Sequence, residues 1–384
     1  MKLLIIYHAG LVQDAKAIFR EYARQGVDLT VIVPSTFHSS QGQQLTYSPG
    51  QDEAGHRFIP VPFRAGRFAF GALFSAIKNA APEVIHVFDE YSSTYLTQAI
   101  ICRNILFGKK VPVFAYAFQN IPFAAPPLIA GFSIKSFKRL IYSIGYPLIF
   151  WYHNRNVAGV SGSNSQALLN VKNCNPRALT KLIFWGVDFN DFGAQDPAAC
   201  KNLLHLPPDE KIIGYVGRLV EEKGLDVLIE ATSNIKHSRL LLVGGGDCQN
   251  ELEKLAVKLG VKERVYFFNN VPRHELKTYY NAFDVFVLPS KTMPGWKEQY
   301  GRVLVEAMAC GLPIVASSSG AISEVLAGYP RGAIFAEGDA RNLAQKIASA
   351  ARTPFSENFN LADFLHKFSV QHFVSEHLNF YKNI

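Results

Sequence analysis

The stretch EQYGRVLVEAMACGLPIVAS, residues 298–317, carries two glutamates around a predicted helix start. Glu298 precedes the turn at Tyr300-Gly301, whereas Glu306 lies inside a helical pattern that spans 302–310. Free amide groups and the helix dipole at such a start favour a bound phosphate, and a glycine there lets backbone approach a ligand. Two glutamates at this spacing are usually solvated helix charges. The stretch alone therefore leaves open whether it forms a phosphate-binding site or an ordinary solvated helix.

Two further loops follow predicted strands upstream of this stretch. The segment VGRLVEEKG, residues 216–224, places Arg218 and Lys223 after a strand, where a guanidinium and an ammonium suit phosphate contacts. A basic pair in a loop is otherwise ordinary surface. The segment VGGGD, residues 243–247, is a glycine-rich turn without the spacing G-x-G-x-x-G. Neither half of the chain opens with that spacing, which excludes an NAD-dependent dehydrogenase.

The chain alternates short apolar runs with helical patterns, which predicts an α/β protein with parallel sheets covered by helices on both faces. Strands are predicted at Leu3–Tyr7, Val27–Val33, Val84–Phe88, Val111–Phe118, Lys211–Val216, Leu240–Val243, Val265–Phe268, Val285–Leu288 and Ile314–Ala316. Helices are predicted at Ala15–Arg24, Thr94–Phe107, Leu225–Thr232, Gln249–Leu259, Glu275–Asn281, Arg302–Cys310 and Asp363–Asn383. The 384 residues suit two domains, with a boundary in the aperiodic segment Phe189–Pro208. Two such domains facing each other would form a ligand cleft between the carboxyl ends of their sheets.

The basic excess of the chain is confined to its first half. The formal net charge is +8, and residues 1–188 hold 18 basic against 9 acidic side chains, whereas residues 189–384 hold 21 against 22. Such an asymmetry favours an anionic partner, such as nucleic acid, a lipid surface or a phosphorylated substrate. No known nucleic-acid-binding module is found in the sequence, so nucleic acid is not expected as a partner.

Several features predict a cytoplasmic protein that is soluble or peripheral to a membrane. The five cysteines are scattered and form no C-x-x-C, which favours reduced thiols and argues against a zinc site. The apolar start is too short for a signal peptide, and no run of about 18 apolar residues could span a bilayer. The stretch Phe132–Tyr152 combines aromatic side chains with Lys135, Lys138 and Arg139 and has no acid. It is either a core helix with a basic edge or a membrane-surface segment, and the charge asymmetry favours the second.

The three motifs, in this order, resemble those of the retaining glycosyltransferases of family four, which have the GT-B fold. That family carries a strand–G-R-x(4)-K-G turn, a strand–G-x-G turn and an E-x(7)-E motif that runs into E-A-x-A-x-G-x-P-V. The similarity is strong over 160–350 and loose over 1–159. It implies an acceptor-side Rossmann-like domain over 1–190, a nucleotide-sugar-binding one over 191–364, and a terminal helix over 365–384 that crosses back onto the first domain. Packing of that helix on the second domain is the alternative.

The resemblance also implies how a nucleotide diphosphate sugar would be held. Arg218 and Lys223 would clamp the diphosphate, Glu298 would hold sugar hydroxyls, and Glu306 would accept hydrogen bonds from the ribose. The backbone around Val271–Arg273 would lie near the base. The full implied donor-binding set is Gly10, Gly217, Arg218, Lys223, Gly244, Val271, Arg273, Glu298, Gln299, Tyr300, Gly301, Arg302, Val303 and Glu306.

Catalysis in such a site requires stabilisation of the negative charge that grows on the departing phosphate. No D-x-D pair is present in the sequence, so no metal or other cofactor is expected, and Arg218 and Lys223 would take the place of Mg²⁺. Many family members carry a histidine where this chain has Gln119, which cannot exchange a proton at neutral pH. Gln119 would either bond a sugar hydroxyl or bond local backbone, and proton transfer through a donor phosphate oxygen fits retention. His8 and His86 end predicted strands and are interpreted as hydrogen-bonded structural histidines.

The resemblance therefore predicts an enzyme, with Glu298, Arg218, Lys223 and Gln119 as its catalytic residues. It would move a hexose from a UDP- or GDP-linked donor to an acceptor hydroxyl, with retention. A lipid-linked or saccharide acceptor in surface-polysaccharide synthesis fits the basic first half, which could contact an anionic membrane. The alternatives are a nucleotide-sugar epimerase or hydrolase of the same fold, and a non-catalytic protein that binds sugar nucleotides.

Overall fold

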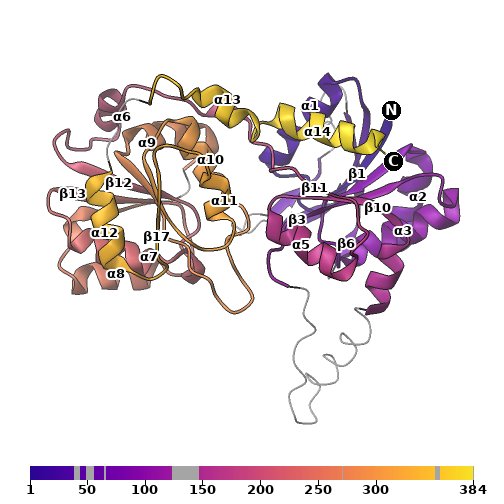
Figure 1. Cartoon of the computed structure of the whole chain (residues 1–384), viewed down its shortest axis with the longest axis horizontal. Coiled ribbons are helices and arrows are strands. Elements are labelled where there is room, and N and C mark those ends of the chain that lie inside the picture. The colour runs from indigo at the N-terminus through magenta and orange to yellow at the C-terminus, as the bar shows by residue number, and fades with distance from the viewer. Residues whose placement is uncertain are drawn as a thin grey trace, which may run out of the picture. The chain divides into compact units, whose positions relative to one another are not determined.

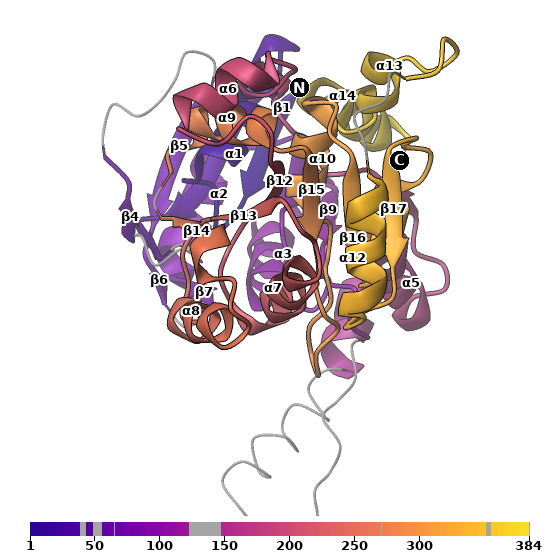
Figure 2. The ribbon, with the colours of Figure 1, turned by 90° about the vertical axis from the view of Figure 1, so that its left-hand side faces the viewer.

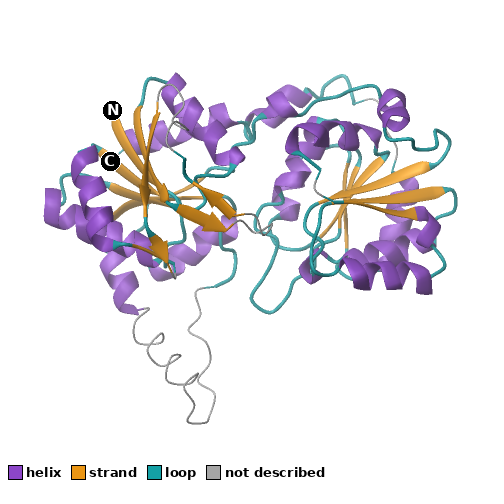
Figure 3. Ribbon diagram, turned by 180° about the vertical axis from the view of Figure 1, so that it is seen from behind, coloured by secondary structure: helices purple, strands orange, loops and turns teal. Residues whose placement is uncertain are grey.

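The computed structural model describes residues 1–38, 44–48, 56–64, 66–122, 147–269, 271–350 and 355–383. The chain divides into two compact units, of which the first comprises Met1–Gly186 with Val370–Ile384 and the second Val187–Ser369. The divisions expected from the sequence are 1–190, 191–364 and a terminal helix over 365–384. Each unit is an open parallel sheet with helices on both faces (Figure 3), and the α/β architecture predicted from the sequence is confirmed.

The sheet of the first unit is entirely parallel. Its strands are β1 (Lys2–Ile6), β2 (Asp28–Pro34), β5 (His56–Val61), β8 (Val84–Val87), β9 (Val113–Ala117), β10 (Val157–Gly162) and β11 (Thr180–Leu182). They lie in the order β11-β10-β9-β8-β1-β2-β5. Two small antiparallel pairs accompany the sheet, namely β3 (Thr36–His38) with β4 (Gln44–Thr46), and β6 (Phe63–Arg64) with β7 (Arg67–Phe68). The helices of this unit whose bounds are described include α1 (Gln13–Arg24), α2 (Phe70–Ala80), α3 (Thr94–Phe107), α5 (Ser165–Cys174) and α14 (Val370–Lys382).

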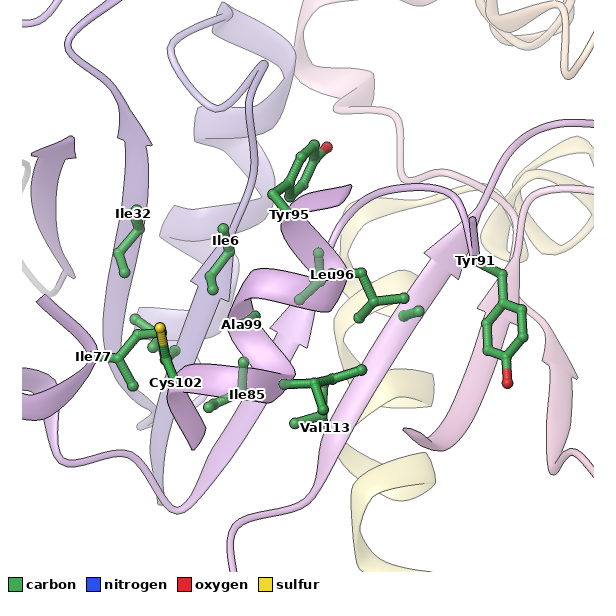
Figure 4. Close-up of a cluster of buried hydrophobic side chains, with 14 of the residues drawn as sticks. Ile6, Ile32, Ile77, Ile85, Tyr91, Tyr95, Leu96, Ala99, Cys102 and Val113 are labelled. Carbon is green, nitrogen blue, oxygen red and sulfur yellow. The ribbon is translucent and has the colours of Figure 1, made fainter. Parts of the chain in front are cut away.

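Both faces of this sheet are buried, which is why its strands are continuous apolar runs. In β8, Ile85 and Val87 belong to the cluster beneath α2 and α3, which Figure 4 shows. The intervening His86 points to the opposite face, where its Nδ1 lies 2.5 Å from the Tyr381 hydroxyl of α14. Helices α1 and α14 lie side by side on that face (Figure 1). Because successive side chains of a strand point to opposite faces of the sheet, β8 contacts a different helix layer on each face.

Helix α14 belongs to the first unit and is held there by polar as well as apolar contacts. His377 Nε2 lies 2.8 Å from Ser161 Oγ, and Lys181 forms an ion pair with Glu376 at 2.8 Å. A Cβ at Gly159 would lie 2.7 Å from the Phe380 ring, so this strand residue must be small for α14 to approach. Complete burial lowers the pKa of His377 to about 3, so the imidazole that holds α14 is neutral at ordinary pH.

The second unit repeats the architecture with six parallel strands. They are β12 (Lys211–Val216), β13 (Ser238–Val243), β14 (Val265–Phe268), β15 (Val285–Leu288), β16 (Ile314–Ser317) and β17 (Gly332–Phe335). Their order in the sheet is β14-β13-β12-β15-β16-β17. The helices are α6 (Pro197–Leu203), α7 (Leu225–Ser233), α8 (Gln249–Lys258), α9 (Leu276–Ala282), α10 (Arg302–Ala309), α11 (Ile322–Leu326), α12 (Ala340–Ser349) and α13 (Leu361–His366). Figure 2 shows α7, α8 and α12 on one face of this sheet and α9 and α10 on the other.

One sequence prediction about helices is wrong, and one helix lies where none was predicted. The expected helix over Asp363–Asn383 is two helices, α13 and α14, because the Phe368 carbonyl accepts the Val187 amide at 2.8 Å and Ser369 Oγ donates to the His366 carbonyl at 2.8 Å. The bridge Phe189–Pro208, which is aperiodic in sequence, contains α6. Asp196 caps that helix by accepting the amides of Ala198 and Ala199.

The sequence suggests that the stretch Phe132–Tyr152 is a core helix or a membrane-surface segment. Its residues 132–146 lie outside the described residues, and its residues 147–152 belong to a helix that continues to position 154. Within the part of the chain that the structure describes, no helix combines the length and the apolar character needed to cross a bilayer.

Candidate functional site

The predicted phosphate-binding elements of the second unit meet at the carboxyl edge of its sheet. Strands β12, β13 and β15 are neighbours in this sheet, and the loops that follow them hold Arg218, Gly244 and Glu298. Gly217 and Gly244 have φ values of 151° and 133°, which favour glycine. A Cβ on Gly244 would lie 2.0 Å from the Gly217 carbonyl oxygen, so close packing of these two loops already requires a glycine.

Lys223 reaches Glu298 because the loop after β12 packs against the loop after β15. Lys223 ends a short 3₁₀ turn, η2 (Glu221–Lys223), and Gly224 follows with φ 64°. A Cβ on Gly224 would lie 2.2 Å from the Pro289 carbonyl oxygen. The glycine of the K-G pair therefore lets the lysine approach the second loop.

The Lys223–Glu298 ion pair is short and largely buried. Lys223 Nζ lies 2.6 Å from Glu298 Oε2, and the two side chains are 14% and 9% exposed. Ser290 Oγ donates to the same oxygen at 2.8 Å, and the ammonium lies 4.9 Å from the Trp296 ring centre, within cation–π range. An ammonium has three N–H donors, so Lys223 can hold Glu298 and still donate to an anion.

Glu306 lies 1% exposed inside α10, with two hydrogen-bond donors and a second guanidinium around its carboxylate. Its Oε1 lies 3.0 Å from Arg273 Nη1 and 3.3 Å from Arg302 Nε, and its Oε2 accepts the Tyr280 hydroxyl at 2.8 Å. Burial and the adjacent Glu306 raise the pKa of Tyr280 well above its usual value. Arg273 also forms an ion pair with Asp191 at 3.4 Å. Since a carboxylate offers about four lone-pair positions, the hydrogen bonds from Arg273 and Tyr280 leave room for a further donor.

Helix α10 begins directly after the second loop. Gly301 is its N-cap and has φ 71°, and Leu304 donates its amide to the Gly301 carbonyl. Gln299 and Val303 are partly exposed around this start, whereas Tyr300 is buried, which raises its pKa well above the usual value. The first turn thus presents its amides at the same edge of the sheet as Glu298.

Arg218 lies at the exposed side of this edge. Its Nη2 forms an ion pair with Glu222 Oε1 at 3.1 Å, and its carbonyl accepts the Tyr215 hydroxyl at 2.7 Å. Burial raises the pKa of Tyr215, with Glu298 raising it further and Arg218 lowering it. The Tyr215 hydroxyl thus holds the main chain of this loop at Arg218.

The remaining predicted donor-binding residues lie in separate places. Val271 is partly exposed in the segment between β14 and η4 (Arg273–Glu275). Gly10 belongs to the first unit, where a Cβ would lie 2.7 Å from Val33 Cγ1 and 3.2 Å from the Tyr7 carbonyl oxygen. Packing within that unit is sufficient to require a glycine at this position.

Gln119, the predicted substitute for a family histidine, also belongs to the first unit. Its amide donates to Glu90 Oε1 at 2.7 Å, and its carbonyl accepts Asn170 Nδ2 at 3.2 Å. These contacts fix the main chain after β9. They leave open the role of the amide side chain.

Sequence reasoning missed the partners that position the two glutamates. Tyr280 and Ser290 are not marked by any motif, and Arg273 is expected from the sequence to contribute backbone rather than its guanidinium. Ser290 follows the apolar run of β15 by two residues, so its place at a strand end is a usable signal. Nothing in the local sequence marks Tyr280, because its contact with Glu306 joins residues 26 positions apart.

Comparison with known proteins shows a similarity to glycosyltransferases. Residues 201–362 match the family Glycosyl transferases group 1. D-inositol 3-phosphate glycosyltransferase of Mycobacteroides abscessus is 34% identical over 165 residues, covering 42% of this chain and 36% of that protein. An uncharacterized glycosyltransferase of Methanocaldococcus jannaschii is 33% identical over 182 residues, covering 46% and 45%. The chain thus spans about half or less of the curated relatives it matches.

Solved structures resemble the chain over its whole length. Sucrose-phosphate synthase from Thermosynechococcus elongatus aligns with a TM-score of 0.69 and 20% identity, over 100% of this chain and 99% of that one. HepE of Anabaena in complex with UDP aligns with a TM-score of 0.72 and 19% identity, over 100% of both chains. These likenesses define the fold as that of the GT-B glycosyltransferases.

The two comparisons together confirm the resemblance predicted from the motifs. The segment 201–362, which matches the family Glycosyl transferases group 1, contains the E-x(7)-E motif, Arg218 and Lys223. The chain is therefore a GT-B protein similar to the glycosyltransferases of family four.

Proposed function

We propose that this protein transfers a hexose from a nucleotide diphosphate sugar to an acceptor hydroxyl, with retention and without a metal ion. The observation that carries this proposal is the arrangement around Glu298. A buried carboxylate paired with Lys223 at 2.6 Å lies beside the first turn of α10, in a family-matched unit. Structures of the fold neighbour HepE were solved with UDP and with UDP-glucose, which supports a UDP-linked donor here.

In this proposal the second unit binds the donor. Lys223, Arg218 and the α10 amides contact the diphosphate, where fixed positive charge stabilises the leaving group as the glycosidic bond breaks. Glu298 accepts hydrogen bonds from sugar hydroxyls and keeps the Lys223 ammonium in place. Glu306 uses its remaining lone pair for the ribose, with Arg273 and Tyr280 holding the carboxylate.

The first unit is proposed to bind the acceptor. Gln119 lies at the carboxyl edge of its sheet, which is where ligands of open α/β sheets bind, and Gly10 at the same edge is proposed to lie near the donor diphosphate. The excess of basic residues in 1–188 supports a lipid-linked or saccharide acceptor at an anionic membrane surface. Co-sedimentation with vesicles of anionic phospholipid, but not with zwitterionic vesicles, would support the membrane part; equal recovery with both would refute it.

A donor-binding assay tests the central claim. Thermal shifts are measured with UDP-glucose, GDP-mannose and ADP-glucose, since a donor at 100 times its Kd stabilises the protein by about 2.7 kcal/mol. The proposal expects one sugar nucleotide to raise Tm, and expects Glu306→Ala to weaken that response. His205→Ala, an exposed position in the same unit, is the control. No response to any sugar nucleotide would contradict the proposal.

Turnover separates the proposal from its closest rival, a hydrolase or epimerase of the same fold. UDP release from UDP-glucose is followed with and without an acceptor extract of membrane lipids and oligosaccharides. Release that depends on the extract supports transfer, whereas equal release in water alone supports hydrolysis.

A further inference from the structure

The carboxyl edge of the first sheet holds a group of titratable side chains that the donor site does not use. The sheet order reverses between β1 and β8, because the chain leaves β1 toward β2 on one side and continues through β8 and β9 on the other. Ligands of open α/β sheets bind at such a reversal, beyond the strand ends. His8 follows β1 there, and Asp89 and Glu90 follow β8.

The His8 ring is fixed by a buried chain of hydrogen bonds. Its Nδ1 lies 2.6 Å from the Tyr95 hydroxyl, which is also hydrogen-bonded to Asp89. Figure 4 shows the Tyr95 hydroxyl pointing away from the apolar cluster that includes Ile6 and Ile85. The ring also packs against Phe63, with centroids 6.4 Å apart. His8 therefore has one well-defined orientation.

The proton arrangement follows from counting donors. Burial raises the pKa of Asp89, and the hydrogen bonds that its carboxylate accepts from Tyr95, Ser93 and the Glu90 amide oppose this rise. Because the single Tyr95 proton goes to Asp89, the Tyr95 oxygen takes its second bond from His8 Nδ1–H. His8 Nε2 is then left with a lone pair, and within the described part of the chain it has no hydrogen-bond partner. Burial lowers the pKa of His8, although Asp89 opposes this, so the neutral ring is favoured.

Glu90 supplies the second observation. Its Oε1 accepts the amides of Phe118 at 2.9 Å and Gln119 at 2.7 Å. Its Oε2 is out of solvent and without a hydrogen-bond partner among the described residues. A buried polar atom of this kind is rare in folded proteins and calls for a partner. Burial and the neighbouring Asp89 raise the pKa of Glu90 to about 8, so at neutral pH Oε2 mostly carries a proton.

We infer that His8, Tyr95, Asp89 and Glu90 form a binding site for a neutral hydroxylated ring, a sugar or polyol, and that this site rejects phosphate. His8 Nε2 accepts a hydrogen bond from a ligand hydroxyl, and Glu90 Oε2 donates one. An anion would meet the Asp89 carboxylate, and no lysine or arginine among the described residues affects the ionisation of these four groups. This inference rests on the proposed function and specifies the part of the acceptor that the first unit holds.

The test compares neutral probes with their phosphorylated counterparts on the full chain. Ligand-observed NMR titrations use myo-inositol against D-myo-inositol 3-phosphate, and methyl α-D-glucopyranoside against glucose 6-phosphate, all with UDP present. At least one neutral probe is expected to bind at least tenfold more tightly than its phosphate. Stronger binding of a phosphate, or no binding by either neutral probe, overturns the inference without the need for any variant.

Variants then assign the binding to this site. His8→Phe keeps the packing against Phe63 and removes Nε2, so it should weaken the neutral probe at least tenfold. Tyr95→Phe should have a smaller effect on probe affinity, because it removes only the hydrogen bond that orients the His8 ring. The same exchange at exposed His205 is the control and should change nothing. Equal probe affinity in His8→Phe and wild type would overturn the inference. UDP affinity is measured in the same samples to separate the two outcomes. If the wild-type protein does not bind UDP, the proposed function is refuted. If it binds UDP but no neutral probe, only this inference is refuted.

Discussion

Replacing Tyr280 by phenylalanine removes one hydroxyl from the surroundings of Glu306 and leaves the ring in place. The hydroxyl donates to Glu306 Oε2 at 2.8 Å, and the two residues are 0% and 1% exposed. A hydrogen bond to a charged group contributes about 1.5–3 kcal/mol. In a domain of about 150–250 residues each kcal/mol shifts Tm by about 2–4 °C, so Tyr280→Phe should lower Tm by about 3–12 °C.

Tyr279→Phe provides a matched control for this experiment. Tyr279 lies next to Tyr280 in α9, and its hydroxyl has no hydrogen-bond partner within the described ranges. The same exchange there should change Tm by no more than about 1–2 °C, which corresponds to about 0.5 kcal/mol for a substitution away from such features. Tm is measured by calorimetry on the intact chain. Equal decreases for the two variants would refute the claim that the Glu306 contact is the cause.

The same variant links stability to the proposed donor site. If the ribose uses Glu306, a carboxylate freed from Tyr280 is less well oriented, and UDP-glucose should bind about 3–10-fold more weakly, about 0.6–1.4 kcal/mol. Isothermal titration with UDP-glucose measures this change, with Tyr279→Phe again as control. A fall in Tm with unchanged UDP-glucose affinity would mean that Glu306 serves the fold alone.

The remaining predictions concern the donor site and the helix α14. Lys223→Ala should lower kcat by at least tenfold with a smaller change in UDP affinity, because its charge acts on the leaving diphosphate; a change in KM alone would argue against that role. Steady-state rates should be the same with and without EDTA, and loss of activity that Mg²⁺ restores would show that a metal is required. His377 has a folded-state pKa of about 3 against 6.5 when unfolded, so its contribution to stability is complete above pH 6.5 and is lost as pH falls toward 3. The expected loss by pH 5 is about 2 kcal/mol, measured by urea unfolding, and His377→Gln should flatten the profile; an unchanged slope in this variant would contradict the assignment.

Local sequence patterns were sufficient for most elements of the fold. The helix Thr94–Phe107 and the strands Lys211–Val216, Val265–Phe268 and Val285–Leu288 have the bounds predicted from their apolar runs. Such runs are reliable because a strand buried on both faces tolerates few polar residues. The break between α13 and α14 was missed, because aromatic residues keep a helical spacing across it while the Phe368 carbonyl bonds to Val187, a residue remote in sequence.

The donor motifs were also readable from the sequence, since each consists of residues close together in the chain. The order of the short motifs and the resemblance they carry name Arg218, Lys223, Glu298 and Glu306 as candidate residues, and the family match over 201–362 includes these motifs. The partners of these residues cannot be named in this way. Lys223 meets Glu298 across 75 positions and Tyr280 meets Glu306 across 26, so only the folded sheet brings them together.

The order of residues along the chain determined the α/β class, the repeated alternation of strands and helices, and the residue types of the proposed diphosphate site. These features depend on local periodicity and short spacing. Three-dimensional packing was needed to find Tyr280 and Arg273 beside Glu306, and to distinguish His8 from His86. His8 follows β1 and His86 lies in the neighbouring strand β8. His86 is fully buried against α14, whereas His8 is partly exposed at the sheet edge. That difference arises from which helix covers each strand end, and a one-dimensional pattern carries no information about it.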